Sequence, residues 1–343
     1  MDAPIGRVSA CNGSISVRFN QLGLTGVQVS ELCFGTMSFG GDANEEESVK
    51  MFNRCRDKGI NFFDCADGYS KGAAEQILGK CIKGSRDELV ITSKCFVPTS
   101  ENINARGANR RHVLQAVEAS LRRLGTDRLD VLLMHRWDEN VPLEETLRAL
   151  EKLVSDGKVL YLGASNYAAW QIATGLGISK RNNWPRFDVI QPMYSLVKRQ
   201  AEVEIFPLAQ EESLAVMTYS AVGGGLLSGK YGKGVASRSG RISTNPEYTK
   251  RYSENWVFDV AEKFTALAAS NNLHPVSLAV AWAAANPAVT CPIIGARNLE
   301  QLEPSLSAID IEMDEELYSS VSALSRTPPP ATDRLEEQLS SGS

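Results

Sequence analysis

Eight short apolar runs, separated by longer segments, constrain the fold of this 343-residue chain more than any other feature. The runs are rich in Val, Ile and Leu and almost continuous in apolar character, as is typical of parallel strands that are buried on both faces. They fall at residues 30–35, 61–66, 89–94, 129–135, 159–164, 188–194, 214–220 and 289–294.

The segments between these runs have the pattern of amphipathic helices. Val113, Val117 and Leu121 are spaced four residues apart, which places them on one face of a helix. Gly125 then predicts the end of a helix over 110–124. Further helices are predicted at 45–58, 143–156, 259–271, 276–285 and 298–308. Alternation of strand and helix eight times predicts an α/β fold, a closed (β/α)8 TIM barrel rather than a doubly wound sheet.

The two ends of the chain differ from this pattern. Residues 16–29 alternate like a small β-hairpin that could close the floor of the barrel. Residues 1–15 are polar and irregular, and residues 325–343 are rich in proline and charge, so both are predicted to be flexible. We therefore predict a single domain over 16–324.

Composition narrows the class of protein. The net charge of −5 and the lack of a basic patch argue against a nucleic-acid partner. No apolar run approaches the roughly 20 residues of a membrane span, and the N-terminus lacks the pattern of a signal peptide. The 7 cysteines are odd in number and form no CxxC pair, which favours free thiols in a reducing cytoplasm over disulfides. We predict a cytoplasmic protein without a metal site; its oligomeric state is not indicated.

Polar side chains stand where several predicted strands end. Asp64 and Tyr69 follow the second run, Lys94 ends the third and His135 ends the fourth. In a (β/α)8 barrel, catalytic residues collect at the carboxyl ends of the strands. Taken singly, each of these residues has an ordinary structural explanation. Their joint placement predicts an active site.

The motifs around these residues resemble those of aldo-keto reductases. They are ELCFGTMSFGG, FFDCADGY, LVITSK, LDVLLMH, GASNY, DVIQPMYS, YSAVGGGLLSGKY and PIIGARNLEQL, in the order of the strands. The resemblance covers residues 17–310 and is to the longer-chain branch that holds bacterial and channel β-subunit-like members. It implies that Asp64, Tyr69, Lys94 and His135 are the family's catalytic tetrad.

These four side chains suit the reduction of a carbonyl group. Hydride delivery to a carbonyl carbon leaves an alkoxide, which needs a proton donor and a positive environment. Tyr69 would be the general acid and His135 would orient the carbonyl. A lysine ammonium is expected to lower the pKa of the phenol, which ordinarily lies near 10. Lys94 would supply that charge and Asp64 would hold it in place.

The resemblance also implies a nicotinamide cofactor, NADPH, with NADH possible. No predicted strand is followed by a GxGxxG fingerprint, so binding would not be of the Rossmann type. Tyr219 would stack on the nicotinamide, and Ser165, Asn166 and Gln191 would bind its carboxamide. Arg297 would meet the 2′-phosphate and so favour NADPH. The other cofactor positions implied are Gly35, Thr36, Met37, Asp64, Ser220, Ala221, Gly223, Leu226, Ser228, Lys230, Gly295 and Gln301.

The substrate pocket is predicted to contain Phe96 and Trp137, which favours an apolar or aromatic carbonyl over a highly charged one. Two other functions stay open. The chain could be a cofactor-binding regulatory subunit with little turnover, as in relatives that serve membrane channels. It could also form a Schiff base at Lys94, which requires a neutral lysine.

Overall fold

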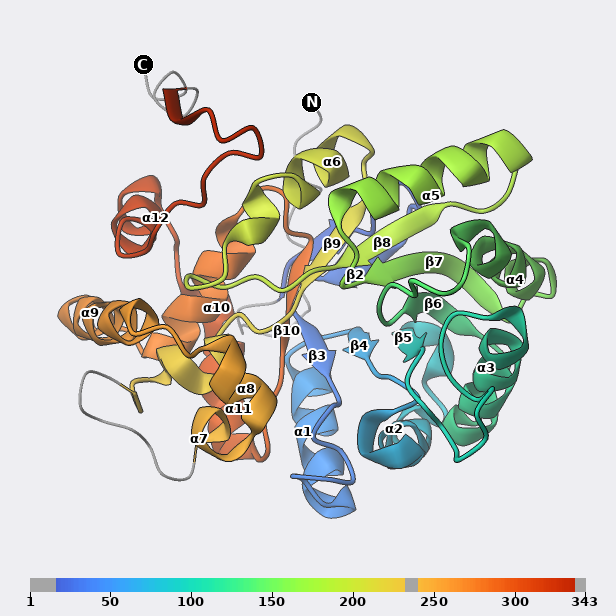
Figure 1. The fold of residues 1–343 in the computed structure, drawn as a ribbon. Helices are drawn as coiled ribbons and strands as arrows, with labels where there is room; N and C mark the ends of the chain where they lie inside the picture. Colours follow the sequence, from blue (N-terminus) through green and yellow to red (C-terminus); the bar gives the residue numbers. More distant parts are fainter. Residues whose placement is uncertain (1–16, 232–239, 337–343) are drawn as a thin grey trace.

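The computed structural model describes residues 17–231 and 240–336, and Figure 1 shows a central barrel of strands surrounded by helices. Eight strands of the described residues form the closed barrel, in the order β10-β3-β4-β5-β6-β7-β8-β9. All neighbours are parallel, and β10 pairs with β3 to close the circle. The strands are β3 (Cys33–Gly35), β4 (Phe62–Asp64), β5 (Val90–Cys95), β6 (Leu129–Met134), β7 (Val159–Ser165), β8 (Phe187–Gln191), β9 (Ala215–Thr218) and β10 (Cys291–Ile294). The predicted fold and all eight predicted strands are confirmed.

Six helices lie within a few residues of their predicted positions. They are α1 (Glu45–Asp57), α3 (Arg110–Leu124), α4 (Leu143–Ser155), α9 (Trp256–Ser270), α10 (Pro275–Ala285) and α11 (Leu299–Leu306). The capping residues explain why α3 was clear from the sequence. The Asn109 side chain accepts a hydrogen bond from the His112 amide at its start, and Gly125 ends it in a left-handed conformation with φ 64°.

Six further α-helices in the part of the chain that the structure describes were not predicted. They are α2 (Ala73–Ile82), α5 (Ala169–Asn182), α6 (Ile205–Glu211), α7 (Arg241–Thr244), α8 (Pro246–Arg251) and α12 (Glu315–Ser322). In α5, small residues on the buried face hide the apolar period. Gly175 packs so closely on the ring of Phe187 that a Cβ there would lie 2.7 Å from Cε2. The helix therefore approaches β8 through a glycine and carries less of the apolar stripe that marks a helix in a sequence.

The predicted N-terminal hairpin is formed by β1 (Phe19–Gln21) and β2 (Gln28–Ser30), which pair antiparallel. Leu22 and Val29 belong to the same buried cluster as the side chains inside the barrel. The Asn20 side chain donates a hydrogen bond of 2.7 Å to the carbonyl of Thr290, just before β10 begins. The hairpin therefore covers the amino-terminal end of the barrel, and the carboxyl ends of the strands are left for a functional site.

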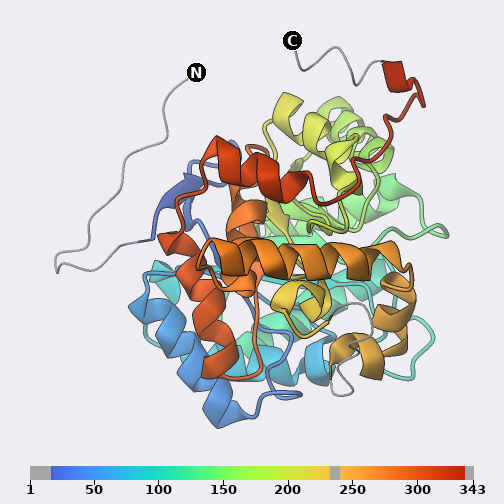
Figure 2. The same ribbon diagram turned by 90° about the vertical axis from the view of Figure 1, so that its left-hand side faces the viewer.

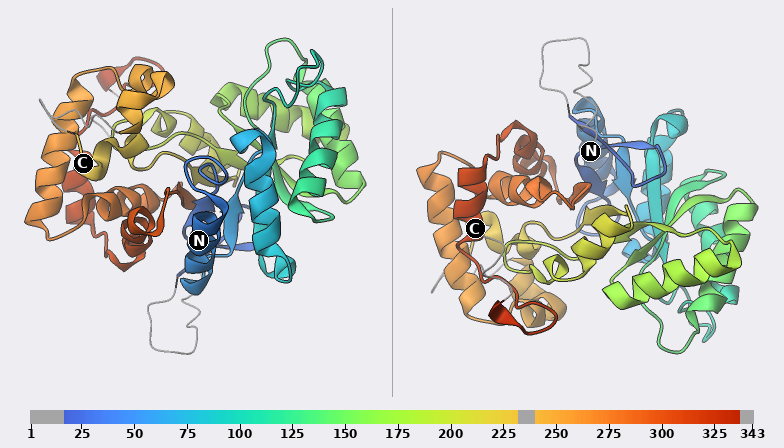
Figure 3. Two further views of the ribbon diagram at one scale, coloured as in Figure 1. Left: turned by 90° about the horizontal axis from the view of Figure 1, so that it is seen from below. Right: turned by 90° about the horizontal axis from the view of Figure 1, so that it is seen from above.

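Helix α12 and the segment after it lie at the periphery of the molecule, outside the barrel strands (Figures 2 and 3). The ring of Tyr318 stacks on Trp282 of α10 at 5.9 Å, and the Trp282 indole donates a hydrogen bond to Ser322. Among the described residues, no helix has both the length and the apolar character to cross a bilayer. The predicted flexible segment 1–15 and the last residues of the predicted tail, 337–343, lie outside the described residues.

Candidate active site

The carboxyl ends of β4 and β5 hold a buried ion pair. Asp64 is the last residue of β4, and Lys94 is the next-to-last residue of β5. Lys94 Nζ lies 2.6 Å from Asp64 Oδ2, with side-chain exposures of 0% and 3%. Lys94 Nζ also donates a hydrogen bond of 2.8 Å to the carbonyl oxygen of Cys65. Because a buried charge is costly unless it is paired, these contacts hold the ammonium in one place.

Tyr69 completes this arrangement from the loop after β4. Lys94 Nζ lies 3.2 Å from the Tyr69 hydroxyl, so one ammonium contacts both the carboxylate and the phenol. Three residues in left-handed conformation follow Tyr69: Ser70, Lys71 and Gly72 have φ of 47°, 55° and 91°. Such a run is rare in chains of L-residues, and it turns the backbone sharply between Tyr69 and the start of α2. The structure thus brings Tyr69 to Lys94, as the sequence predicted.

His135 lies beside the phenol, directly after β6. Its ring meets the Tyr69 ring edge-on, with centroids 6.0 Å apart. Its Nδ1 atom is buried and has no hydrogen-bond partner within the described part of the chain. Burial, with a smaller contribution from the charge of Lys94, lowers the pKa of His135 to about 3. The imidazole is therefore neutral at physiological pH, so it can donate a hydrogen bond to a ligand but adds no charge.

The pKa of Tyr69 corrects one expectation from the sequence. Burial raises the pKa of the phenol to about 12, while the charge of Lys94 acts in the opposite, predicted direction. The net effect is a rise and not the predicted fall, because desolvation of a buried phenolate outweighs the attraction of one ammonium. Tyr69 therefore keeps its proton at neutral pH, which is the form that a general acid needs.

The state of Lys94 bears on the Schiff-base alternative. Burial alone would lower the pKa of Lys94, but the charges and hydrogen bonds of Asp64 and Tyr69 raise it above its ordinary value. A lysine nucleophile must be neutral to attack a carbonyl carbon. Lys94 is held in the charged form, so its surroundings favour an electrostatic role.

A chain of hydrogen bonds extends from Asp64 across the mouth of the barrel. The second carboxylate oxygen of Asp64 accepts from Thr92 Oγ1 at 2.6 Å and from Gln191 Nε2 at 3.0 Å. Ser165 Oγ donates to the carbonyl of Gln191 at 3.0 Å. Thr92 was not among the predicted site residues. Thr92 could have been predicted from the sequence, because a residue two positions before Lys94 lies on the same face of the strand.

The same chain reaches β9 through Asn166. Asn166 Nδ2 donates to the carbonyl of His135 at 2.9 Å, and its Oδ1 accepts from the Tyr219 hydroxyl at 2.6 Å. Asn166 has φ 59°, a left-handed conformation that asparagine tolerates better than most residues. The side chains predicted to bind a nicotinamide ring are thus gathered in one hydrogen-bonded group next to the tetrad.

The loops after β3 and β10 also lie together. Thr36 donates two hydrogen bonds to the carbonyl of Asp64, and Ser38 Oγ donates to the carbonyl of Ala296 at 2.6 Å. Gly35 is packed so tightly that a Cβ would lie 2.7 Å from Ile293 Cγ2. Met37 stays 43% exposed, so its side chain is free to contact a ligand.

The glycine-rich segment after β9 forms a tight series of turns. Gly223, Gly224 and Gly225 all have positive φ, of 62°, 66° and 98°. A Cβ on Gly224 would lie 2.6 Å from Tyr248, so these turns bring backbone close to the α8 segment. Leu226 is fully buried, which leaves only its backbone available to a cofactor. Such a glycine cradle fits the close approach of backbone amides to a pyrophosphate.

Arg297 is paired in this structure. Its Nε lies 3.1 Å from Asp42 Oδ2, and Arg241 contacts the same carboxylate at 3.4 Å. The Arg297 amide donates a long hydrogen bond of 3.4 Å to Gln301. The predicted cofactor-binding residues Arg297 and Gln301 are therefore adjacent, and the two guanidinium groups of Arg297 and Arg241 share the single carboxylate of Asp42. The exposed Lys230 follows the glycine cradle at the edge of this region.

The remaining predicted residues also lie in the segments that follow the carboxyl ends of the barrel strands. Phe96 and Trp137 follow β5 and β6 and are half-buried. Ser220 has φ 65° and precedes the buried Ala221. Ser228 Oγ donates a hydrogen bond to the carbonyl of Gly225. A Cβ on Gly295 would contact the carbonyl oxygen of Gly35. Together, the polar side chains of Ser165, Asn166 and Gln191, the ring of Tyr219 and the guanidinium of Arg297 fit a nicotinamide dinucleotide.

Comparison with known proteins agrees with this geometry. The model of the aldo/keto reductase family matches residues 31–326. The chain belongs to the aldo/keto reductase family. Its relatives include an uncharacterized oxidoreductase, YrpG, of Bacillus subtilis, 33% identical over 88% of this chain and 94% of the relative. A probable voltage-gated potassium channel subunit beta of Arabidopsis thaliana is 34% identical over 86% and 92%. A versiconal hemiacetal acetate reductase of Aspergillus parasiticus is 30% identical over 88% and 94%. The protein is an NAD(P)H-dependent oxidoreductase of this family.

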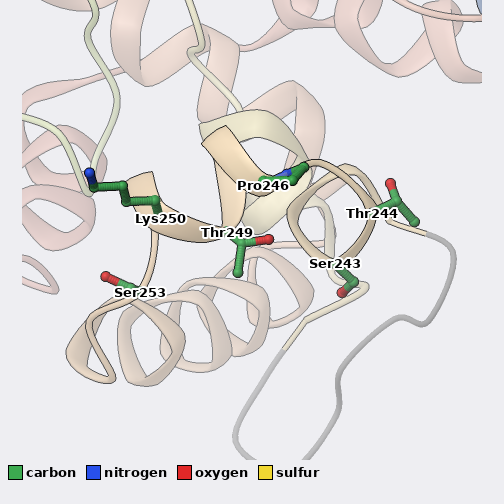
Figure 4. Close-up of a pocket in the computed structure, with 6 residues that line it drawn as sticks. All are labelled: Ser243, Thr244, Pro246, Thr249, Lys250 and Ser253. Carbon is green, nitrogen blue, oxygen red and sulfur yellow. The ribbon is translucent and has the colours of Figure 1, made fainter.

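A surface hollow of this aldo/keto reductase lies over α7 and α8 (Figure 4), and no residue of the candidate tetrad lines it. It has a volume of about 420 Å³ and is lined by Ser243, Thr244, Pro246, Thr249, Lys250 and Ser253. Its lining has neither a carboxylate nor an imidazole, so it lacks a partner for acid–base chemistry. We assign the chemistry to the mouth of the barrel.

Asp67 is a second buried carboxyl close to the tetrad of this aldo/keto reductase. It is 2% exposed, and neither carboxyl oxygen has a hydrogen-bond partner in the described part of the chain. Burial and the nearby Glu75 raise the pKa of Asp67 to about 7, against the smaller effects of Arg123 and Lys94. In the sequence, Asp67 directly follows the predicted strand at 61–66. The structure shows that this carboxyl is buried and that its pKa is raised well above the ordinary value.

Asp67→Asn is expected to stabilise the protein at alkaline pH. The folded carboxyl titrates near 7 and the unfolded one near 3.8, so folded Asp67 holds a proton through this window that the unfolded chain has lost. Stability from this group is thus present below the window and is lost as pH rises through it, by up to about 1.4 kcal/mol per pH unit. Urea unfolding of wild type and variant at pH 5 and pH 8 measures the difference. Asp310→Asn, at an exposed acid, is the matched control; an equal gain at both pH values would contradict the prediction.

Proposed function

We propose that this aldo/keto reductase reduces an aldehyde or ketone to the alcohol with NADPH, reversibly, with Tyr69 as the general acid. One observation carries the proposal. A fully buried ammonium, Lys94, contacts both the Asp64 carboxylate and the Tyr69 hydroxyl at the carboxyl end of the barrel. Relatives whose names describe an oxidoreductase and a reductase support the same reaction class.

The roles of the residues follow from their contacts. NADPH, when bound, would supply the hydride to the carbonyl carbon. The Tyr69 hydroxyl would then give its proton to the carbonyl oxygen, so that hydride and proton together turn C=O into CH–OH. The Lys94 ammonium, 3.2 Å away, would stabilise the phenolate that remains. The neutral His135 would hold the carbonyl oxygen by a hydrogen bond and orient it toward Tyr69.

Several groups support binding of NADPH at the mouth of the barrel. Ser165, Asn166 and Gln191 would bind the carboxamide, and Tyr219 would stack on the nicotinamide ring. Arg297, partly exposed beside Asp42, would bind the 2′-phosphate, which NADH lacks.

Arg297→Met is expected to raise KM for NADPH by about 10-fold to 100-fold, since it removes a charge-assisted hydrogen bond to the phosphate. KM for NADH should change little, because NADH has no group at this position. Steady-state kinetics with both cofactors measures the two effects. Arg148→Met, on the exposed face of α4, is the control. An equal rise in KM for both cofactors would mean that Arg297 contacts a part of the dinucleotide that NADPH and NADH share.

The activity itself is tested by oxidation of NADPH and NADH in the presence of aliphatic, aromatic, sugar and steroid-like carbonyls. Phe96 and Trp137 favour turnover of apolar and aromatic members of this panel. Absence of turnover with every member, by protein that binds NADPH, would reject the proposal.

A second function is favoured by the relatives named as potassium channel subunits. In that case the protein would bind the cofactor as a regulatory subunit and turn over slowly. Retention of NADPH through purification, with turnover well below about one per second, and capture of a membrane partner would support it. Turnover in the usual range for enzymes would argue for the reductase.

A further inference from the structure

Arg136, next to the candidate tetrad, carries a positive charge beside the ring of Phe96. It follows His135 directly and is exposed, and its guanidinium carbon lies 5.7 Å from the centroid of the Phe96 ring. Among the described residues it forms no ion pair with an Asp or a Glu. The nearby Asp138 is engaged by backbone, since its two oxygens accept from the amides of Ala108 at 2.8 Å and Asn140 at 3.0 Å.

The charge of Arg136 acts over the mouth of the barrel. Burial lowers the pKa of His135 most strongly, and Lys94 and Arg136 add to that effect. Burial raises the pKa of Tyr219, and Arg136 is one of the charges that oppose it. His135 follows β6 and Tyr219 follows β9, three strands further around the barrel. Arg136 follows β6 and contacts Phe96, which follows β5, so its guanidinium lies at the carboxyl end of the barrel, where the site is.

Aromatic side chains that follow β6 and β7 pack into a wall. Trp137 meets Tyr167 edge-on at 5.4 Å and Trp170 at 5.6 Å. Tyr167 is buried and rests in turn on Phe187 at 6.0 Å, which fixes the base of the wall. Trp170 is 62% exposed, an unusual state for a large ring with packed neighbours. Rings held in this way provide contact area at low entropic cost.

We propose that the substrate of the reductase is an aromatic aldehyde or ketone that carries an anionic oxygen group, such as a carboxylate. Arg136 binds the anion, and Trp137 and Trp170 hold the aromatic ring. The inference rests on the proposed function and refines the expectation from the sequence, which was an aromatic carbonyl without high charge. A guanidinium is suited to this task because its planar fork matches a carboxylate and stacks on aromatic rings.

The simpler explanation is that Arg136 only covers Phe96 with its apolar stem, as exposed arginines often do. The two explanations differ in one measurable respect. A covering side chain affects charged and neutral substrates alike, whereas an anion-binding side chain distinguishes between them.

The kinetic test compares 4-carboxybenzaldehyde with its neutral methyl ester, methyl 4-formylbenzoate. In wild type, kcat/KM is expected to be higher for the acid. In Arg136→Met the ratio of kcat/KM for acid to ester should fall by about 10-fold to 100-fold. Arg136→Lys, which keeps the charge but loses the fork, should give an intermediate ratio. Arg148→Met, a control that removes a distant exposed guanidinium, should leave the ratio unchanged. A ratio that Arg136→Met does not alter overturns the proposal.

A binding measurement separates this inference from the proposed reaction. Quenching of tryptophan fluorescence in the NADPH-loaded protein gives affinities for benzoate and for benzamide, its neutral analogue. Wild type should prefer benzoate, and Arg136→Met should lose that preference. Equal affinities in wild type reject the anion site even if neutral aldehydes are reduced. Preference for benzoate without turnover of any aldehyde keeps the anion site and rejects the reductase.

Discussion

Tyr69→Phe is expected to lower kcat/KM for carbonyl reduction by about 100-fold to 10,000-fold. The substitution removes the hydroxyl group that lies beside the Lys94 ammonium, and with it the proton to be donated, and it leaves the ring in place. Because the pKa of Tyr69 is raised to about 12, the wild-type donor stays protonated across the neutral range. The full difference in kcat/KM between wild type and Tyr69→Phe should therefore be measurable at neutral pH. Steady-state turnover of an aromatic aldehyde with NADPH measures it, and KD for NADPH should stay within about threefold, since the phenol is not expected to hold the cofactor.

Tyr161→Phe is the matched control for this experiment. Tyr161 lies near the start of β7 and packs beside the cluster inside the barrel, far along the strand from its carboxyl end. Its variant should keep wild-type turnover. If Tyr69→Phe retained turnover within a few-fold of wild type, another group would have to donate the proton. The contact between Lys94 and Tyr69 would then be structural.

The fold of this chain could be predicted from its sequence because strand and helix patterns agree at every step around the barrel. Runs such as 129–135 are apolar on both faces, and only a parallel sheet covered by helices buries both. Helices α2 and α5 escaped prediction for a physical reason. Each meets its neighbours partly through small residues, such as Gly79 against the carbonyl of Leu124, and glycines weaken an apolar pattern.

The candidate tetrad could be named from the sequence because Asp64, Lys94 and His135 stand at the ends of three recognisable strands or directly after them. Tyr69 follows in the loop after the strand that ends at Asp64. What the sequence could not supply was the balance of opposing effects. The pKa of Tyr69 depends on how burial compares with the charge of Lys94, and that comparison needs the distance of 3.2 Å and the buried surroundings. The state of Asp67 is a similar case. Nothing in the motif distinguishes an exposed loop carboxyl from one that is buried with no hydrogen-bond partner in residues 17–231 and 240–336.

Long-range pairings were also beyond the sequence. Arg297 and Asp42 are far apart in the chain, and their contact arises because β3 and β10 are neighbours at the closure of the barrel. The gathering of Ser165, Asn166 and Gln191 into one hydrogen-bonded group likewise depends on the register of β7 and β8. Resemblance to the family named these residues, and the barrel geometry explains how they come together.

Lys94→Met is expected to cost both activity and stability. The variant leaves Asp64 buried with hydrogen bonds from Thr92 and Gln191 but without a cation, and loss of one partner of a buried pair destabilises by about 3–5 kcal/mol. Activity should fall at least as far as in Tyr69→Phe, because both the charge beside the phenol and its anchor are lost. Urea unfolding and NADPH-dependent turnover measure the two losses.

The double variant Asp64→Asn with Lys94→Met separates them. Replacing the carboxylate by its neutral analogue removes the unpaired charge, so much of the stability should return while activity stays lost. Lys50→Met, which breaks the exposed pair with Glu46, should leave the unfolding midpoint unchanged. If the double variant were no more stable than Lys94→Met, the cost would lie in packing around the lysine stem. The ion pair would then not be what holds this end of the barrel in its reactive geometry.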